Sequence, residues 1–98
     1  MANFSELIKG NKPVLVDFFA TWCGPCKAMA PILEDLKSKV GDKATIIKVD
    51  VDKSQQAGRA YKIQGVPTLI IFKNGQIKWR KSGVVSAKEL EKVINGIN

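Results

Sequence analysis

The sequence has no histidine and only two cysteines among its 98 residues. A structural zinc site needs four nitrogen or sulfur ligands, and one copy of this chain offers only the two thiols. A zinc site shared between two copies stays open on these residues alone, but we expect no metal site. The chemistry of this protein therefore depends on what the two sulfur atoms do.

Long apolar runs are also missing. No run is long enough to cross a bilayer, and the opening segment MANFSELIKGN lacks the continuous apolar stretch of a signal peptide. These absences predict a cytoplasmic protein that does not contact a membrane. A purely structural disulfide is unusual in that compartment.

Arginine is scarce, although the chain is basic. Its 16 basic residues outnumber the 9 acidic ones, giving a net charge of +7, yet only Arg59 and Arg80 are arginines. Surfaces that bind nucleic acid usually cluster basic residues and favour arginine, whereas the lysines here are spread along the chain. We expect a solubilising surface that binds no nucleic acid. Its densest group, Lys73, Lys78, Arg80 and Lys81, favours acidic protein partners.

The apolar periodicities predict helices and strands of one domain, residues 1–98. Phe4, Leu7 and Ile8 share one face of a first helix that starts at Asn3. The expected helices cover residues 3–10, 25–40, 54–62 and a final segment with the capping box Ser86 and Glu89. The expected strands cover residues 13–19, 45–51, 67–72 and the segment QIKWRKS after a KNG turn.

The order of these elements predicts an α/β fold. The segment PVLVDFF, residues 13–19, is apolar on both alternating faces except at Asp17, which is typical of a central strand covered by helices on both sides. Strand–helix–strand units imply parallel crossovers, and the final hairpin adds an antiparallel strand. We expect a four-stranded mixed sheet flanked by helices on both faces.

Cys23 and Cys26 lie between a predicted strand and a predicted helix. Residues three apart on a helix are neighbours, so the two sulfur atoms can form a disulfide with little backbone movement. A structural staple over so short a loop adds little stability, and two inert core thiols fit poorly beside Gly24 and Pro25. Redox chemistry explains the pair best, although the other possibilities stay open.

The start of a helix lowers the pKa of a thiol there through its free N–H groups and its dipole. Cys23 precedes the first turn, whereas Cys26 is expected one turn deeper and nearer the core. Cys23 should therefore attack a substrate disulfide, and Cys26 should resolve the mixed disulfide. Gly24 lets a substrate approach the sulfur, and Pro25 is tolerated in a first turn but adds no positive charge, which favours a reductant over an oxidant.

The segments FFATWCGPCKAMAP and GVPTLIIFKNG closely resemble the thioredoxin family, from about Val14 to the C-terminus. The resemblance implies the thioredoxin fold and disulfide reduction on protein substrates by a monomer without a bound cofactor. It also implies that electrons come from NADPH through a thioredoxin reductase. Matched by position, Cys23 is the nucleophile, Cys26 is the resolving thiol, and Trp22 covers the site.

The resemblance assigns further residues to substrate binding. Pro67 matches the family's cis-proline facing the disulfide, Gly83 matches a glycine that leaves room for substrate, and Pro31 matches a kink in the active-site helix. The backbone of Val66, before Pro67, is expected to pair with an extended substrate segment. An apolar rim around Cys23 is expected from a set of four side chains, Trp22, Ala28, Val66 and Val84.

Asp17 is set among apolar residues, so burial should raise its pKa. The resemblance matches it to the family's buried carboxylate, and we expect it to accept the proton of Cys26. The alternative is a structural carboxylate satisfied by the backbone or by Lys48. Lys48 matches the family's neighbouring lysine, and it either pairs with Asp17 or is a solvated lysine at the sheet edge.

Three departures from the family pattern stand out. Phe19 replaces a usual tryptophan, the chain is basic where many relatives are acidic, and the usual first strand is missing before the first helix. The last departure leaves residues 45–51 as an exposed sheet edge. Two other functions stay open: a dedicated reductant or oxidase for one partner, and an assembly subunit that uses the surface without redox cycling.

Overall fold

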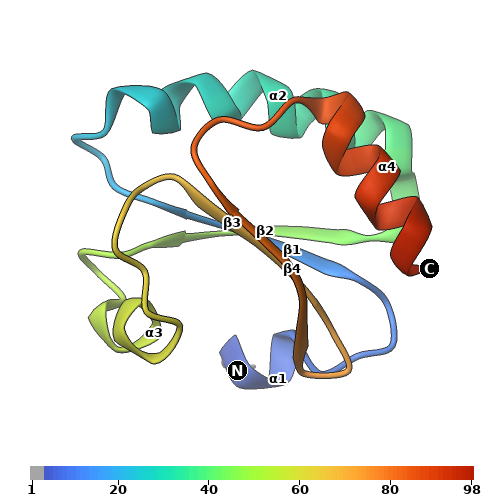
Figure 1. Cartoon of the computed structure of the whole chain (residues 1–98), viewed down its shortest axis with the longest axis horizontal. Coiled ribbons are helices and arrows are strands. Elements are labelled where there is room, and N and C mark those ends of the chain that lie inside the picture. The colour runs from blue at the N-terminus through green and yellow to red at the C-terminus, as the bar shows by residue number, and fades with distance from the viewer. Residues whose placement is uncertain (1–3) are drawn as a thin grey trace.

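The fold is a four-stranded sheet with helices on both faces, seen in a computed structural model that describes residues 4–98 (Figure 1). The helices are α1 Phe4–Leu7, α2 Gly24–Val40, the 3-10 turn η1 Gly41–Lys43, α3 Gln55–Ala60 and α4 Ala87–Ile97. The strands are β1 Val14–Phe19, β2 Thr45–Asp50, β3 Thr68–Lys73 and β4 Gln76–Ser82. The predicted α/β architecture and element order are confirmed.

The sheet has the strand order β2-β1-β3-β4. β1 is parallel to β2, with Val14 opposite Thr45, and antiparallel to β3. β3 and β4 form the predicted hairpin, in which Asn74 and Gly75 both have positive φ angles, 55° and 78°. β1 is thus central, as its two apolar faces predicted, and β2 is an edge strand within the described part of the chain.

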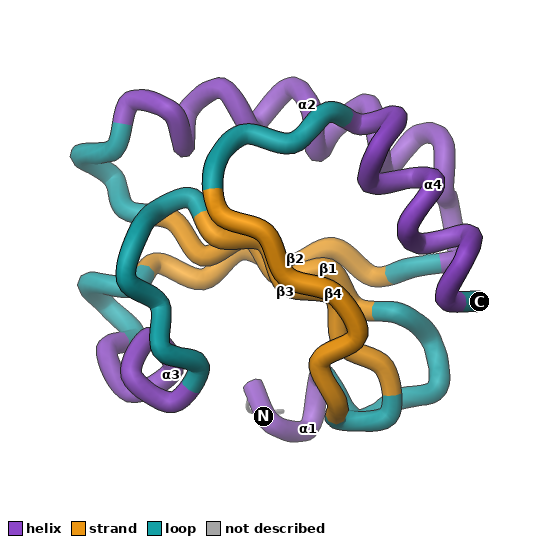
Figure 2. The backbone as a smooth tube through the Cα atoms, viewed as in Figure 1, coloured by secondary structure: helices purple, strands orange, loops and turns teal. Residues whose placement is uncertain are grey.

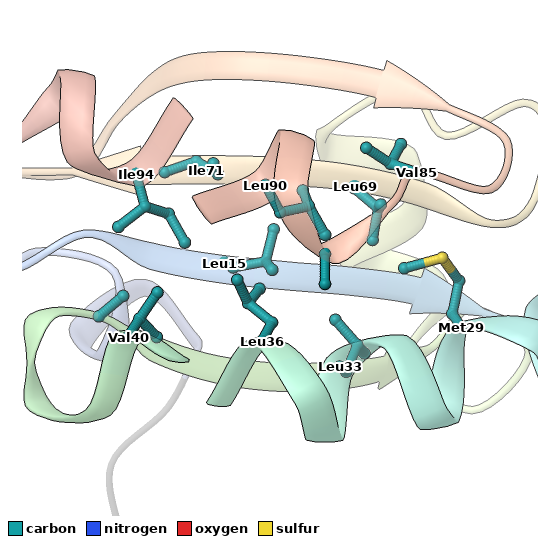
Figure 3. Close-up of a cluster of buried hydrophobic side chains, with 12 residues drawn as sticks. Leu15, Met29, Leu33, Leu36, Val40, Leu69, Ile71, Val85, Leu90 and Ile94 are labelled. Atoms are coloured by element: carbon teal, nitrogen blue, oxygen red, sulfur yellow. The ribbon is translucent and has the colours of Figure 1, made fainter. Parts of the chain in front are cut away.

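Alternate side chains of β1 enter two different cores. Leu15 packs with α2 and α4 in a cluster whose buried members include Met29, Leu36, Leu90 and Ile94 (Figure 3). Val16 and Phe18, on the opposite face, pack in a second cluster with residues of α1 and α3. This alternation follows from the two-residue period of a strand. It also places Asp17 on the face that Leu15 occupies, toward α2.

The N-terminal helix is shorter than expected. The predicted cap at Asn3 lies outside the described residues, and α1 ends at Leu7 rather than near Gly10. Leu7 is 46% exposed, so its assignment to the inner face was wrong, whereas Ile8 is buried. Phe4 holds the helix in place by ring contacts with Phe18, Tyr61 and Phe72.

Loops from separate parts of the chain gather at one end of the sheet, on the left of Figure 2. They include the segment before α2, the turn after β2 and the loop that leads into β3. Cys23, Val51 and Val66, one from each loop, pack in a common cluster. No helix in residues 4–98 has the length and hydropathy needed to span a bilayer.

The core around α2 gives a test of this packing. Leu36→Ala should lower the free energy of unfolding by roughly 2–5 kcal/mol, because Leu36 is fully buried and its removal leaves a cavity. Leu7→Ala is the matched control and should cost less than about 1 kcal/mol, since Leu7 is largely exposed. Urea unfolding followed by circular dichroism measures both, and equal losses would contradict the assignment of the core.

Candidate active site

The two cysteines form a disulfide at the start of α2, with their Cα atoms 5.3 Å apart. Cys23 is the N-cap residue, and its backbone is extended, with φ −88° and ψ 115°. Pro25 lies in the first turn, where the helix does not need its missing N–H group. The expected pairing and the expected start of the helix are therefore confirmed.

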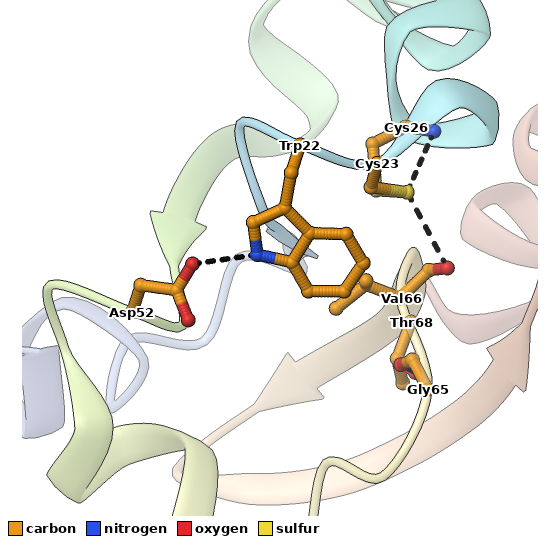
Figure 4. The surroundings of a disulfide bond; sticks show 7 residues. All are labelled: Trp22, Cys23, Cys26, Asp52, Gly65, Val66 and Thr68. Atoms are coloured by element: carbon orange, nitrogen blue, oxygen red, sulfur yellow. Dashed lines mark hydrogen bonds between the residues drawn. A yellow bond between two sulfur atoms is a disulfide. The ribbon is translucent and has the colours of Figure 1, made fainter.

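The sulfur of Cys23 has two polar neighbours (Figure 4). The backbone N–H of Cys26 donates to Cys23 Sγ over 3.1 Å, and the carbonyl oxygen of Val66 lies 3.5 Å from the same sulfur. An N–H group directed at a sulfur at a helix start stabilises negative charge on it. The Val66 carbonyl brings the loop before β3 against the same atom.

Burial does not distinguish the two cysteines as expected. Cys23 is 3% exposed and Cys26 is 6% exposed, so the prediction that Cys26 is the deeper residue was wrong. Val66 covers Cys23 from the opposite loop, and sequence spacing contains no signal for that contact. The asymmetry between the two sulfurs comes instead from the amide of Cys26, which is directed at Cys23.

The loop facing the disulfide has the expected cis peptide bond between Val66 and Pro67. Its shape is fixed by neighbouring strands: the N–H of Gly83 donates to the Pro67 carbonyl over 2.8 Å, and the Thr68 hydroxyl donates to the Gly65 carbonyl over 2.6 Å. Gly83 has φ +96°, a conformation that side chains other than glycine rarely adopt. The positions of Val66, Pro67 and Gly83 beside one another agree with the predicted substrate surface.

The indole of Trp22 lies between Asp52 and the Cys23–Val66 contact (Figure 4). It is 72% exposed, and its Nε1 donates to Asp52 Oδ2 over 2.9 Å. Sequence reasoning missed this role of Asp52, because the two residues are 30 positions apart and belong to different loops. The carboxylate holds a large apolar surface in the open beside the sulfur.

The remaining predicted rim residues are also accessible. Val84 is 48% exposed, and Ala28, Gly24 and Pro25 are exposed at the start of α2. Val66 is half-buried because it packs against the cysteines. The rim is therefore an exposed apolar surface above two almost inaccessible sulfur atoms.

Asp17 is fully buried, and neither of its carboxylate oxygens has a hydrogen-bond partner. Burial raises its pKa from 3.8 to about 6, and the positive charge of Lys48 opposes part of this increase. The raised pKa that the sequence predicted is thus supported by a physical cause, the loss of water around the charged form. A carboxyl group that titrates near pH 6 can hold or release a proton under physiological conditions.

The direct ion pair between Asp17 and Lys48 is not formed. The two residues are opposite each other in the β1–β2 register, but Lys48 is exposed and its Nζ lies 4.7 Å from the centre of the Phe19 ring. A cation over an aromatic face is attracted by the ring's electrons. Phe19, where the family usually has tryptophan, therefore positions the ammonium group whose charge acts on Asp17 through space.

The titration of Asp17 makes the stability depend on pH. Because the folded state keeps this proton to a higher pH than the unfolded chain, the free energy of unfolding should fall as pH rises from about 4 to 6, by up to about 3 kcal/mol, and then level off. Asp17→Asn should remove this fall and be more stable than the wild type at pH 7. Urea unfolding of the oxidised protein between pH 4 and 8 measures it.

The control for this prediction is Asp42→Asn, which changes an exposed carboxylate and should keep the wild-type pH dependence. The account of Asp17 is contradicted if the asparagine variant at position 17 unfolds the protein at pH 7. It is also contradicted if the stability difference between that variant and the wild type does not change between pH 4 and 7.

Comparison with known proteins covers nearly the whole chain. The family model described as Thioredoxin matches residues 1–96. A thioredoxin-like protein of Synechocystis sp. is 50% identical over 90 residues, which cover 91% of this chain and 86% of that protein. A bifunctional thioredoxin reductase/thioredoxin of Mycobacterium leprae is 39% identical over 99 residues, covering 97% of this chain and 22% of that longer protein.

A solved structure shows the same similarity in three dimensions. A chain from a study of the thiol resolving mechanism in yeast mitochondrial 1-Cys peroxiredoxin via glutathione/thioredoxin systems superposes with a TM-score of 0.85 at 36% sequence identity. The superposition covers 95% of this chain and 86% of that chain. The similarity therefore includes the sheet, both helical layers and the segment that carries the cysteines.

Proposed function

This chain belongs to the thioredoxin family, and we propose that within it Cys23 is the attacking thiol and Cys26 the resolving thiol. The family consists of thiol–disulfide oxidoreductases, so the chain reduces protein disulfides by dithiol–disulfide exchange. The observation that carries our assignment is the hydrogen bond from the Cys26 amide to Cys23 Sγ, at the positive end of α2. The thiolate is the nucleophile in this exchange, and only Cys23 receives this stabilisation.

The reaction proceeds in two exchanges. The Cys23 thiolate attacks one sulfur of the substrate disulfide, forms a mixed disulfide and releases the other substrate sulfur as a thiolate. Cys26 then loses its proton and attacks Cys23 Sγ, which releases the second substrate thiolate and closes the Cys23–Cys26 disulfide. The two thiols are oxidised and the substrate disulfide is reduced by two electrons.

Asp17 is the proposed acceptor of the Cys26 proton. It lies on the side of β1 that faces α2, it is fully buried, and its oxygens have no other hydrogen-bond partner. A pKa of about 6 lets it take a proton from a thiol and return it during later steps at neutral pH. Lys48 is the proposed positioning residue that keeps this carboxyl group from becoming too weak an acid.

Substrate binding uses the rim above the sulfurs. The backbone of Val66 pairs with an extended segment of the substrate, and Gly83 leaves space for that segment. Trp22 and Val84 offer apolar contacts, and the bond from Trp22 to Asp52 fixes the indole before substrate arrives. A surface built mostly from backbone and apolar contacts suits many protein substrates.

A thioredoxin reductase that uses NADPH is the proposed source of electrons, and the protein works as a cytoplasmic monomer. The Mycobacterium leprae relative supports this partner, because it combines a thioredoxin reductase and a thioredoxin in one chain. The apolar rim serves the reductase as well as the substrates, since both must reach Cys23. No cofactor bound to this chain is needed, because the electrons are carried by the two sulfur atoms.

Trapping separates the roles of the two thiols. Cys26→Ser should accumulate a covalent complex with a disulfide-bearing protein, because the mixed disulfide at Cys23 is no longer resolved. Cys23→Ser should form no such complex, and it serves as the matched control. Non-reducing gel electrophoresis with mass mapping of the joined cysteine measures both. Trapping by Cys23→Ser would reverse our assignment, and activity retained by both variants would indicate an assembly role.

Turnover tests the electron source and the proton acceptor together. Insulin reduction with NADPH and a thioredoxin reductase should be abolished by Cys23→Ser and slowed about 10-fold or more by Asp17→Asn, because the latter removes a general base. NADPH absorbance at saturating reductase measures the rate. An unchanged rate in Asp17→Asn would refute the proton-acceptor role, and a wild type that consumes no NADPH would refute the proposed electron source.

A further inference from the structure

A basic cleft lies beside the cysteines, outside the rim described above. Its volume is about 440 Å³, and it lies between α3 and the loop that leads to Val66; its lining residues are Val51, Gln55, Gly58, Arg59, Lys62, Ile63 and Gln64. Val51 packs against the cluster that contains Cys23, and Gln64 precedes Val66 by two residues. A substrate segment that reaches the sulfur therefore passes the mouth of this cleft.

The charged groups of the cleft are all positive. Arg59 and Lys62 are its charged lining residues, both are exposed, and neither has a carboxylate within ion-pair distance in the described part of the chain. The nearest acidic residues along the chain have other partners: Asp52 accepts from Trp22, and Asp50 accepts from the amides of Asp52 and Lys53. The cleft thus offers two unneutralised cations.

The backbone of Lys62 supports a role for its side chain. Lys62 has φ 54°, a left-handed conformation that glycine and asparagine adopt readily and that other residues adopt at a cost. A residue held in an unfavourable conformation points to a function that outweighs local stability. The conformation alone would favour glycine here, and a lysine supplies a charge instead.

Arg80 holds this strained segment in place from the neighbouring strand β4. Its guanidinium donates one hydrogen bond to the carbonyl of Tyr61 and a second, of 2.9 Å, to the carbonyl of Lys62. These carbonyls follow the end of α3, where helical partners run out. Arg80 therefore satisfies the backbone on the far side of the loop and leaves the Lys62 ammonium free for a ligand.

We propose that Lys62 and Arg59 form a cationic subsite for acidic residues that flank the disulfide of a protein substrate. The proposal rests on the function proposed above and specifies its substrate class. Opposite charges at the rim of an interface raise the association rate and select partners, which shows as a change in kcat/KM. The basic balance of the chain, +7, acts in the same direction but without a fixed place.

The test uses three disulfide-linked peptides that differ only in having two Glu, two Gln or two Lys residues beside the cysteine. At low ionic strength the wild type should reduce the Glu peptide with a kcat/KM about 10-fold above that of the Lys peptide. Arg59→Glu with Lys62→Glu should reverse this preference. Lys88→Glu with Lys92→Glu, the same charge change on exposed positions of α4, should leave the order of the three peptides unchanged.

A single substitution separates the charge from the fold. Lys62→Asn removes the ammonium but tolerates the left-handed backbone, so its melting temperature should equal or exceed that of the wild type. Its preference for the Glu peptide should fall about threefold, since one of two charges is lost. The proposal is overturned if Lys62→Asn keeps the wild-type preference, or if the α4 variant loses as much preference as the cleft variant.

The Gln peptide keeps this test apart from the proposed function. If the wild type reduces the Gln peptide but shows no preference between the Glu and Lys peptides, the cationic subsite is wrong and the reductase function stands. If the wild type reduces none of the three peptides, both the subsite and the proposed function are wrong.

Discussion

The hydrogen bond from the Cys26 amide to Cys23 Sγ is the contact on which the chemistry of this site depends. It exists because α2 begins immediately after Cys23, so that an amide of the first turn has no helical partner and is directed at the sulfur. The start of α2 depends in turn on β1, whose buried residues fix where the chain leaves the sheet. The reactivity of one sulfur therefore depends on the central strand of the fold.

The same central strand supplies the groups that surround the cysteines. Its face toward α2 carries Asp17, buried without a partner, and its end leads through Phe19 to the cysteine segment. β3 begins directly after the Val66–Pro67 bond, so pairing of β1 with β3 brings that loop to Cys23. The site is thus an outcome of strand pairing, and the exposed Trp22 is held in place afterwards by a single carboxylate.

Features set by local sequence were predictable, and features set by contacts between distant loops were not. The strand of residues 13–19, the helix start at Cys23 and the KNG hairpin each follow from short patterns, and the structure confirms them. The Trp22–Asp52 bond, the clamp of Arg80 on Tyr61 and Lys62, and the cover of Val66 over Cys23 join residues far apart in the chain. Lys48 was opposite Asp17 as expected, but the Phe19 ring holds its ammonium elsewhere.

The most direct measurement of the central claim is the rate of alkylation of each thiol in the reduced protein as a function of pH, mapped by mass spectrometry. If the backbone stabilises an anion at Cys23, this residue is labelled first, and its rate reaches half of its maximum well below about pH 8.5, the midpoint of an ordinary thiol. Preferential labelling of Cys26, or a Cys23 rate that follows an ordinary thiol across the pH range, would contradict the account.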